Sequence, residues 1–203
     1  MKKRLGILVV SVILAGAGSA VAAESAESAD LPYKEIISSN ADSREVFWDG
    51  IAALGDNDLK TAGGDLEKAV GYDKNCFLAY ILLSQISYAQ GDEETSRLWL
   101  ARMPQEPPEV DGIYDEIRGA LRADDFPVIA KLSAELVRAY PQTMTAIAAL
   151  HLLGRAQYWS GNKDDAFRTL RAAYMYSDLA PGTVPAFGTQ AEINEIETFA
   201  GRR

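Results

Sequence analysis

The sequence predicts an all-α protein in which about four pairs of helices stack along the chain and one capping helix follows them. Three observations predict this fold. Two-residue turn signals recur at a nearly constant spacing, each lies between two stretches with the apolar periodicity of an amphipathic helix, and small residues recur at one place in each pair. Self-similarity at a period of roughly 20–50 residues is typical of stacked repeat architectures.

The turn signals define the register of the pairs. Their first members are 34, 33 and 37 residues apart, and the four signals are Asn57-Asp58, Gly91-Asp92, Asp124-Asp125 and Gly161-Asn162. Asp92, Asp125 and Thr143 are expected to cap helix starts, and Pro127 lies in a first turn, where a missing amide proton is harmless. Within a domain of residues 43–203, the predicted pairs cover about 43–76, 77–108, 109–143 and 144–180.

Small residues are expected where the two helices of a pair approach each other. Such residues occupy one position in the first helix of three pairs and a counterpart position in the second helix: Gly50, Ser84 and Gly154, then Ala62, Ser96 and Ala166. The third pair departs from this pattern, because bulky Ile117 stands where a small residue is expected. One pair cannot bury its own apolar faces, so about three must stack to be stable. A non-repeating helical bundle with coincidental spacing is the alternative.

The end of the chain predicts a capping helix over residues 189–200. Thr189-Gln190-Ala191-Glu192 has the pattern of a capping box, which satisfies amide groups at a helix start. Ile193, Ile196 and Phe199 follow on one side of the predicted helix. A helix with a polar outer face is what an open stack needs to cover its last apolar surface.

The fourth pair carries a specific resemblance in its series Leu153, Gly154, Tyr158, Gly161 and Ala166. This series resembles the tetratricopeptide repeat family, and the resemblance covers roughly residues 43–179. It implies a right-handed α-solenoid whose first helices line a concave groove for an extended peptide or a partner helix. Tyr140-Pro141 is similar to a variant in exported bacterial members that help to assemble the envelope.

The first residues predict an export signal. Lys2, Lys3 and Arg4 precede an uncharged apolar stretch over residues 5–18, and small residues follow it. This pattern predicts a Sec-type signal peptide over residues 1–23, cleaved after Ala22 or Ala23. An uncleaved anchor is the alternative. Residues 24–42 are predicted to form a flexible linker, from which Ile36 and Ile37 dock onto the helical domain, and the protein is expected in the periplasm or outside the cell.

Charge and cysteine content limit the partners. Removing the leader changes the formal net charge from −9 to −12. Such a surface repels phosphate backbones and anionic lipids, which argues against nucleic-acid binding, and no membrane insertion is expected after signal cleavage. The single cysteine, Cys76, cannot form an internal disulfide. It is expected to be buried at a junction of two pairs; a reactive thiol or an intermolecular disulfide is the alternative.

The sequence carries no motif for catalysis. His151 is the only histidine, which excludes zinc sites with two histidines. No nucleophile elbow, phosphate-binding loop or paired-cysteine motif occurs. Adjacent carboxylates such as Asp164 and Asp165 lie at predicted helix starts, where the helix dipole favours negative charge. We therefore expect no enzymatic activity, no cofactor and no metal.

The resemblance implies which side chains line the groove. They are Phe47, Ile51, Ile81, Gln85, Tyr88, Tyr114, Arg118, Arg122, His151, Arg155, Tyr158 and Trp159. Aromatic side chains there would supply apolar contact, and arginines would pair with carboxylates of a partner. The alternative is that these side chains pack between helices or pair with the chain's own acids. Trp48, Trp99 and also Tyr88 are expected in the core.

These expectations favour a non-catalytic scaffold or adaptor of the bacterial periplasm that binds a protein or peptide partner, such as an envelope-assembly component. One alternative is a soluble receptor for a small ligand, a peptide fragment or a glycan, stacked on Tyr114, Tyr158 and Trp159. A second alternative is an accessory subunit of a larger enzyme.

Overall fold

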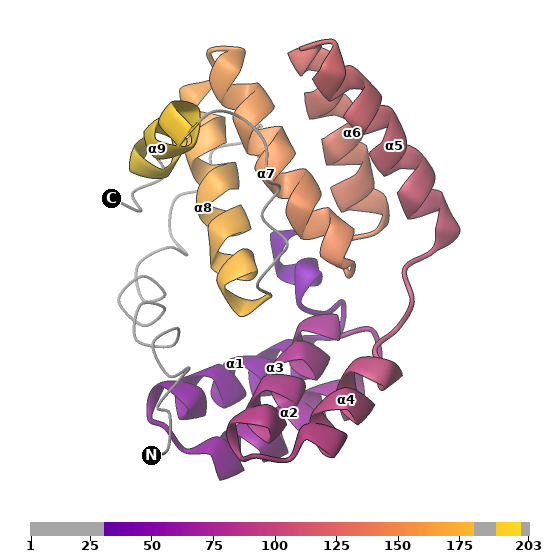
Figure 1. Ribbon diagram of the computed structural model, residues 1–203, viewed down its shortest axis with the longest axis vertical. Helices are drawn as coiled ribbons and strands as arrows, with labels where there is room; N and C mark the ends of the chain where they lie inside the picture. The colour runs from indigo at the N-terminus through magenta and orange to yellow at the C-terminus, as the bar shows by residue number, and fades with distance from the viewer. Residues whose placement is uncertain (1–30, 181–189, 200–203) are drawn as a thin grey trace. The chain divides into compact units, whose positions relative to one another are not determined.

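The computed structural model describes residues 31–180 and 190–199 (Figure 1). The predicted signal peptide, residues 24–30 of the predicted linker and Thr189 of the capping box lie outside this range. The described residues form helices and no strand, so the all-α prediction is confirmed for them. The helices are η2 (Tyr33–Ile36), α1 (Ala41–Gly55), α2 (Leu59–Tyr72), α3 (Phe77–Ala89), α4 (Glu93–Arg102), α5 (Pro108–Arg122), α6 (Phe126–Ala139), α7 (Met144–Trp159), α8 (Lys163–Leu179) and α9 (Gln190–Phe199).

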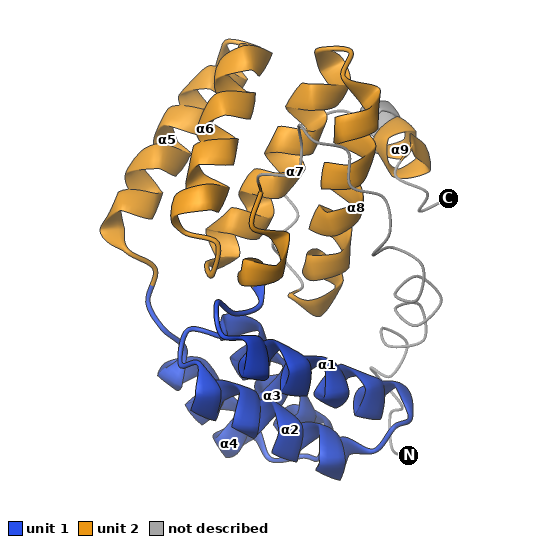
Figure 2. Cartoon of the chain, turned by 180° about the vertical axis from the view of Figure 1, so that it is seen from behind, with its two compact units in different colours: residues 1–29, 37–105 blue, residues 30–36, 106–203 orange. Residues whose placement is uncertain are grey.

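The chain divides into two compact units, which Figure 2 colours separately. Of the described residues, unit 1 holds 37–105 with α1 to α4, and unit 2 holds 31–36 and those from 106 onward, with η2 and α5 to α9. Inside unit 1, α1 packs on α2, α2 on α3 and α3 on α4. Inside unit 2, α5 packs on α6, α6 on α7 and α7 on α8, and α7 also contacts α5. Sequence-adjacent helix pairs are therefore the building blocks of both units.

The four predicted turns are confirmed by their backbone geometry. Their first residues have positive φ, a conformation that favours glycine and that asparagine and aspartate tolerate: Asn57 60°, Gly91 85°, Asp124 51° and Gly161 87°. The second residue of each turn caps the following helix, since its side chain accepts a hydrogen bond from the amide three residues later. Thr143 caps α7 in the same way.

The predicted close approach within pairs is also confirmed. A Cβ atom added to Gly50 would lie 3.0 Å from Leu66 Cγ on α2, and one added to Gly154 would lie 2.6 Å from Leu170 Cγ on α8. In the second pair, the buried hydroxyls of Ser84 and Ser96 are 2.9 Å apart and hydrogen-bonded. Small residues thus set the distance between the helices in three of the four pairs.

The segment before α1 differs from the flexible linker predicted for residues 24–42. Residues Tyr33–Ile36 form the short helix η2 and contact α8 within unit 2. The Tyr176 hydroxyl donates to the Tyr33 carbonyl at 2.5 Å, and the Tyr33 hydroxyl lies 3.3 Å from Thr169 Oγ1. Ile36 and Ile37 are both buried, as predicted. The second half of the expected linker is therefore part of the fold, and α1 begins at Ala41.

Replacing Tyr176 with phenylalanine tests this contact. The lost hydrogen bond should lower the free energy of unfolding by about 1 kcal/mol at pH 7. Burial raises the pKa of Tyr176 above its usual 10, and nearby Tyr33 adds to the shift. Above pH 10 the unfolded chain therefore releases this proton before the folded chain does, and wild-type stability falls as pH rises. Urea denaturation at pH 8 and pH 11 should show a smaller alkaline loss in Tyr176→Phe.

A matched control for this experiment is Tyr88→Phe, because Tyr88 is 66% exposed on α3. We expect the control to resemble the wild type at both pH values. Equal alkaline losses in Tyr176→Phe and the wild type would contradict the assigned role of the Tyr176 hydroxyl.

Cys76 is buried, as predicted, at the residue before α3. Burial raises the pKa of its thiol to about 11, so the reactive thiolate is scarce at neutral pH. Both alternatives for this residue, a reactive thiol and an intermolecular disulfide, require an accessible sulfur. The structure therefore favours packing as the role of Cys76.

Candidate functional site

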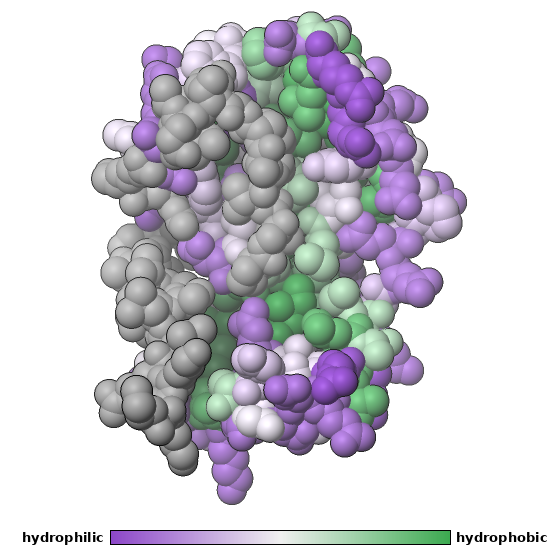
Figure 3. All heavy atoms as spheres, in the orientation of Figure 1, coloured by the Kyte–Doolittle hydropathy of each residue, from purple (hydrophilic) through white to green (hydrophobic). Residues whose placement is uncertain are grey.

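One row of predicted binding residues runs along α5 at the border between its buried side and solvent. Tyr114, Arg118 and Arg122 are spaced by four residues, so they share one side of this helix. This row borders the buried side of α5, which includes Val110, Ile117 and Ala120. Tyr114 is half-buried, whereas both arginines are exposed. Figure 3 shows a largely hydrophilic surface over α5.

The electrostatics of this row leave its cations available to a partner. Arg118 forms an ion pair with Asp115 one turn earlier, at 3.0 Å, but both side chains are more than half exposed. Exposed pairs of this kind contribute only about 0–1 kcal/mol, so a better carboxylate can replace Asp115. Arg122 has no ion pair with any residue in the described part of the chain. Burial raises the pKa of Tyr114, so its hydroxyl keeps its proton and can donate.

His151, which the resemblance placed in the groove, is buried between α7 and α8. Its Nε2 lies 3.0 Å from Ser177 Oγ, and its ring meets the Tyr174 ring edge-on at 4.7 Å. The Ser177 hydroxyl donates to the Ala173 carbonyl at 2.8 Å. Because that hydroxyl proton is engaged, His151 Nε2–H is the donor to Ser177 Oγ. His151 therefore stabilises a helix pair and is not presented to a partner.

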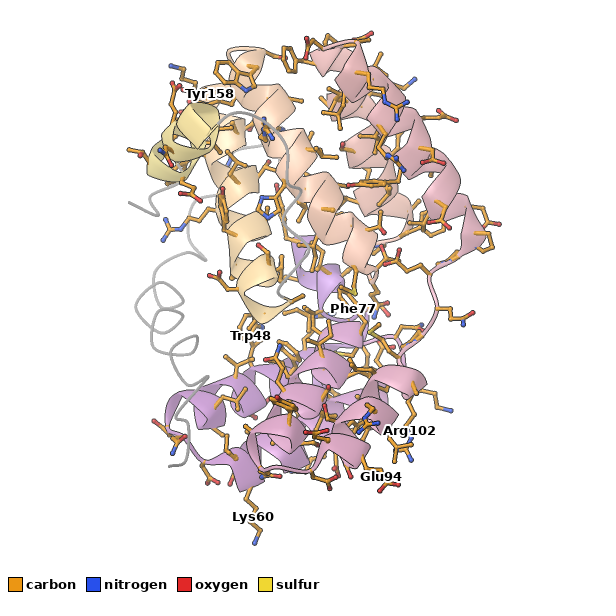
Figure 4. All side chains as sticks on the ribbon, in the orientation of Figure 1. Trp48, Lys60, Phe77, Glu94, Arg102 and Tyr158 are labelled. Atoms are coloured by element: carbon orange, nitrogen blue, oxygen red, sulfur yellow. The ribbon has the colours of Figure 1, made fainter. Side chains whose placement is uncertain are left out.

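Tyr158 is covered by the chain itself. Its hydroxyl donates to the carboxylate of Glu195 on α9, and its ring meets Phe199 of α9 edge-on at 5.0 Å. Figure 4 labels Tyr158 beside α9. The hydrogen bond to Glu195 is the main cause that raises the pKa of Tyr158. Neighbouring Trp159 packs edge-on against the same ring at 5.0 Å and remains 39% exposed. Tyr158 is thus an anchor for α9.

The remaining predicted residues divide between surface and core. Gln85 and Tyr88 are exposed on α3, so the expectation that Tyr88 lies in the core is wrong; Ile86 and Ser87 take the inward positions there. Arg155 is half-buried and already engaged in an interaction within the chain. Phe47, Ile51 and Ile81 are buried, whereas Trp48 and Trp99 are half-buried.

A pattern in the sequence explains which predicted groove residues are buried. Phe47, Ile81 and His151 each stand three residues before the small residue of their helix, Gly50, Ser84 or Gly154. Residues three apart on a helix share a face, so these side chains point toward the partner helix of their own pair. This signal was present in the sequence and would have assigned His151 to the core.

Metal sites and membrane spans are two other features that would bear on function. The part of the chain that the structure describes contains no group of three or more His, Cys, Asp or Glu residues that could hold a metal ion. None of its helices combines the length and the apolar character needed to cross a bilayer.

Comparisons of the chain with protein-family models, with curated proteins and with solved structures find no match.

Proposed function

We propose that this chain is a non-catalytic adaptor of the bacterial periplasm that binds a protein or peptide partner, and that its helix pairs belong to a tetratricopeptide-like α-solenoid. The export pattern of residues 1–23 supports the compartment. The four left-handed turns with their helix caps, and the small residues between paired helices, support the architecture. Such architectures commonly work by presenting an extended binding surface.

The observation that carries the proposal is the row Tyr114, Arg118 and Arg122 on α5. Tyrosine and arginine are enriched among the residues that dominate binding energy in interfaces. Arginine pairs strongly with carboxylates, often through two parallel hydrogen bonds. On a chain with formal net charge −9, two exposed arginines beside a half-buried tyrosine form a local site for an acidic partner segment.

The contacts of Tyr158 argue against the alternative of a receptor that stacks a small ligand. The receptor hypothesis needs Tyr114, Tyr158 and Trp159 to be open together. The Tyr158 ring is instead buried against Phe199, and its hydroxyl is bonded to Glu195. A ligand would have to displace α9 before it could stack on Tyr158.

The test is the double variant Arg118→Glu with Arg122→Glu, compared with the wild type by crosslinking in cells and by capture from periplasmic extract. Hydrogen bonds to charged groups contribute about 1.5–3 kcal/mol each, so losing two should weaken partner binding by more than about tenfold. The helical circular dichroism spectrum should be unchanged, because both side chains are exposed.

The matched control is Lys131→Glu with Arg138→Glu on α6, which makes the same charge change at two exposed positions of the same unit. We expect the control to keep its partners. Equal loss in both variants would assign the effect to net charge alone. Full retention in the α5 variant would show that this row is not the binding site.

A further inference from the structure

A second surface of unit 2 already holds an occupant. It consists of Tyr158 on α7 and of Phe167, Leu170 and Tyr174 on α8, and we call it the end surface. On α9, Ile196 is buried against Leu170 and Tyr174. Phe199 of α9 meets the rings of Tyr158 and Phe167 edge-on, at 5.0 and 5.9 Å. Figure 1 shows α9 beside α8 at this end of the unit.

Two cations lie beside rings of the end surface, although α8 also carries Asp164 and Asp165 in its first turn, and α9 is acidic. Lys163 Nζ lies 5.6 Å from the centre of the Tyr158 ring, and Arg171 Cζ lies 5.9 Å from the centre of the Phe167 ring. The α9 sequence, QAEINEIETF, has three glutamates and no lysine or arginine. Glu195 accepts a hydrogen bond from the Tyr158 hydroxyl. The end surface therefore combines aromatic rings with two cations and binds an acidic amphipathic helix.

The apolar contact between α9 and the end surface is made by two side chains of residues 194–199. Buried Ile196 and half-buried Phe199 supply the apolar contacts of the described part of α9, Glu195 adds a hydrogen bond, and Asn194 and Glu197 are engaged in interactions as well. A ten-residue helix is marginal in water without tertiary support, so α9 depends on these contacts. A longer helix with the same chemistry would make more of them. An internal occupant also lowers the apparent affinity for any competitor, in proportion to the fraction of molecules in which the surface is free.

We propose that the end surface is a docking site for an acidic amphipathic helix of a partner protein, and that α9 occupies it until the partner displaces it. The recognised pattern is the one that α9 displays: an apolar residue, a second apolar residue three positions later, and a carboxylate directly before the first, as in Glu195, Ile196 and Phe199. This names a class of partner for the proposed adaptor function and rests on it.

The test uses full-length chains and a fluorescent synthetic peptide of residues 189–200, acetylated and amidated at its ends. In the variant Ile196→Asp, α9 should leave the end surface, and fluorescence anisotropy should show about tenfold or more tighter peptide binding than in the wild type. Adding Lys163→Glu and Arg171→Glu to Ile196→Asp should remove that gain. A peptide with aspartate in place of its own isoleucine at position 196 should bind neither chain.

A milder variant, Phe199→Ala, keeps the test informative if Ile196→Asp perturbs the fold, because Phe199 is only half-buried. It should produce a smaller gain in the same direction. Equal peptide binding by the wild type and both variants would overturn the proposal. So would a wild-type dimer in size-exclusion chromatography that dissociates on Ile196→Asp, since the occupant would then be α9 of a second copy.

The peptide-binding experiment and the adaptor experiment can fail independently of each other. If the peptide fails to bind while Arg118→Glu with Arg122→Glu still abolishes partner capture, then α9 is a permanent cap and the adaptor function stands. If the peptide binds as expected while the α5 variant keeps all its partners, then the end surface is a binding site and the α5 row is not.

Discussion

Replacing Gly154 with alanine should lower the free energy of unfolding by about 1–3 kcal/mol, even though alanine is the better helix former by about 1 kcal/mol. The added Cβ would lie 2.6 Å from Leu170 Cγ and 3.2 Å from the Leu170 backbone nitrogen. Leu170 is fully buried, so its side chain has little space into which it can move. The helices α7 and α8 must separate, and urea denaturation followed by circular dichroism measures the cost.

Gly119→Ala on α5 is the matched control for this variant. A Cβ at Gly119 would meet nothing within 4 Å, so alanine should stabilise unit 2 by about 0.5–1 kcal/mol. Gly50→Ala in unit 1 should be milder than Gly154→Ala, because its shortest contact, to Leu66 Cγ, is 3.0 Å. If Gly154→Ala stabilised the protein as Gly119→Ala does, the close approach of α7 and α8 would be wrong.

The contact with Leu170 can be isolated by a double-mutant cycle. Leu170→Ala alone should cost about 2–5 kcal/mol, because it leaves a cavity. In that background Gly154→Ala should cost much less than in the wild type, since the methyl group then occupies part of the cavity. Additive losses would show that Leu170 is not what excludes a side chain at position 154.

Local signals explain why the helix pairs could be predicted from the sequence. A glycine or asparagine that permits positive φ, followed by a capping side chain, determines the turn within a few residues, as at Gly91-Asp92 and Gly161-Asn162. The small residues Gly50 and Gly154 recur eight positions before the capping residue and mark the side of each helix that faces its partner. Both kinds of signal act over short distances along the chain.

The contacts that could not be predicted from the sequence join residues that are far apart along the chain. Tyr33 meets Tyr176 of α8, and Tyr158 meets Glu195 of α9. No short-range pattern in the sequence specifies these partners. The sequence therefore predicts a linker over residues 24–42 and an exposed groove position for Tyr158. The candidate site was consequently predicted less well than the helices: His151 and Tyr158 are buried, whereas Arg118 and Arg122 on α5, Gln85 and Tyr88 on α3, and Trp159 are exposed.

The third helix pair departs from the small-residue pattern of the other pairs. Ile117 occupies the position that Gly50 and Gly154 have in the first and fourth pairs, eight residues before the residue that caps the second helix. In the first and fourth pairs, the leucine that touches the glycine lies eight residues after the cap, at Leu66 and Leu170. The residue at that place in the third pair is Ser133. Both Ile117 and Ser133 are fully buried. We infer that the large and small side chains have exchanged helices in this pair.

Variants of this third pair test the exchange. Ile117→Ala should lower the free energy of unfolding by about 2–5 kcal/mol because it leaves a cavity, and Ser133→Leu alone should lower it by about 1–3 kcal/mol through overpacking. Combined, they should lose less than Ile117→Ala alone, since the new leucine fills the space. The Ser133 hydroxyl has no hydrogen-bond partner among the described residues, so its removal costs no hydrogen bond. Urea denaturation of the wild type, the two single variants and the double variant gives the four free energies of unfolding that the cycle needs. Additive losses would mean that the two side chains fill separate spaces, and Ile117 would then be a true irregularity of the third pair.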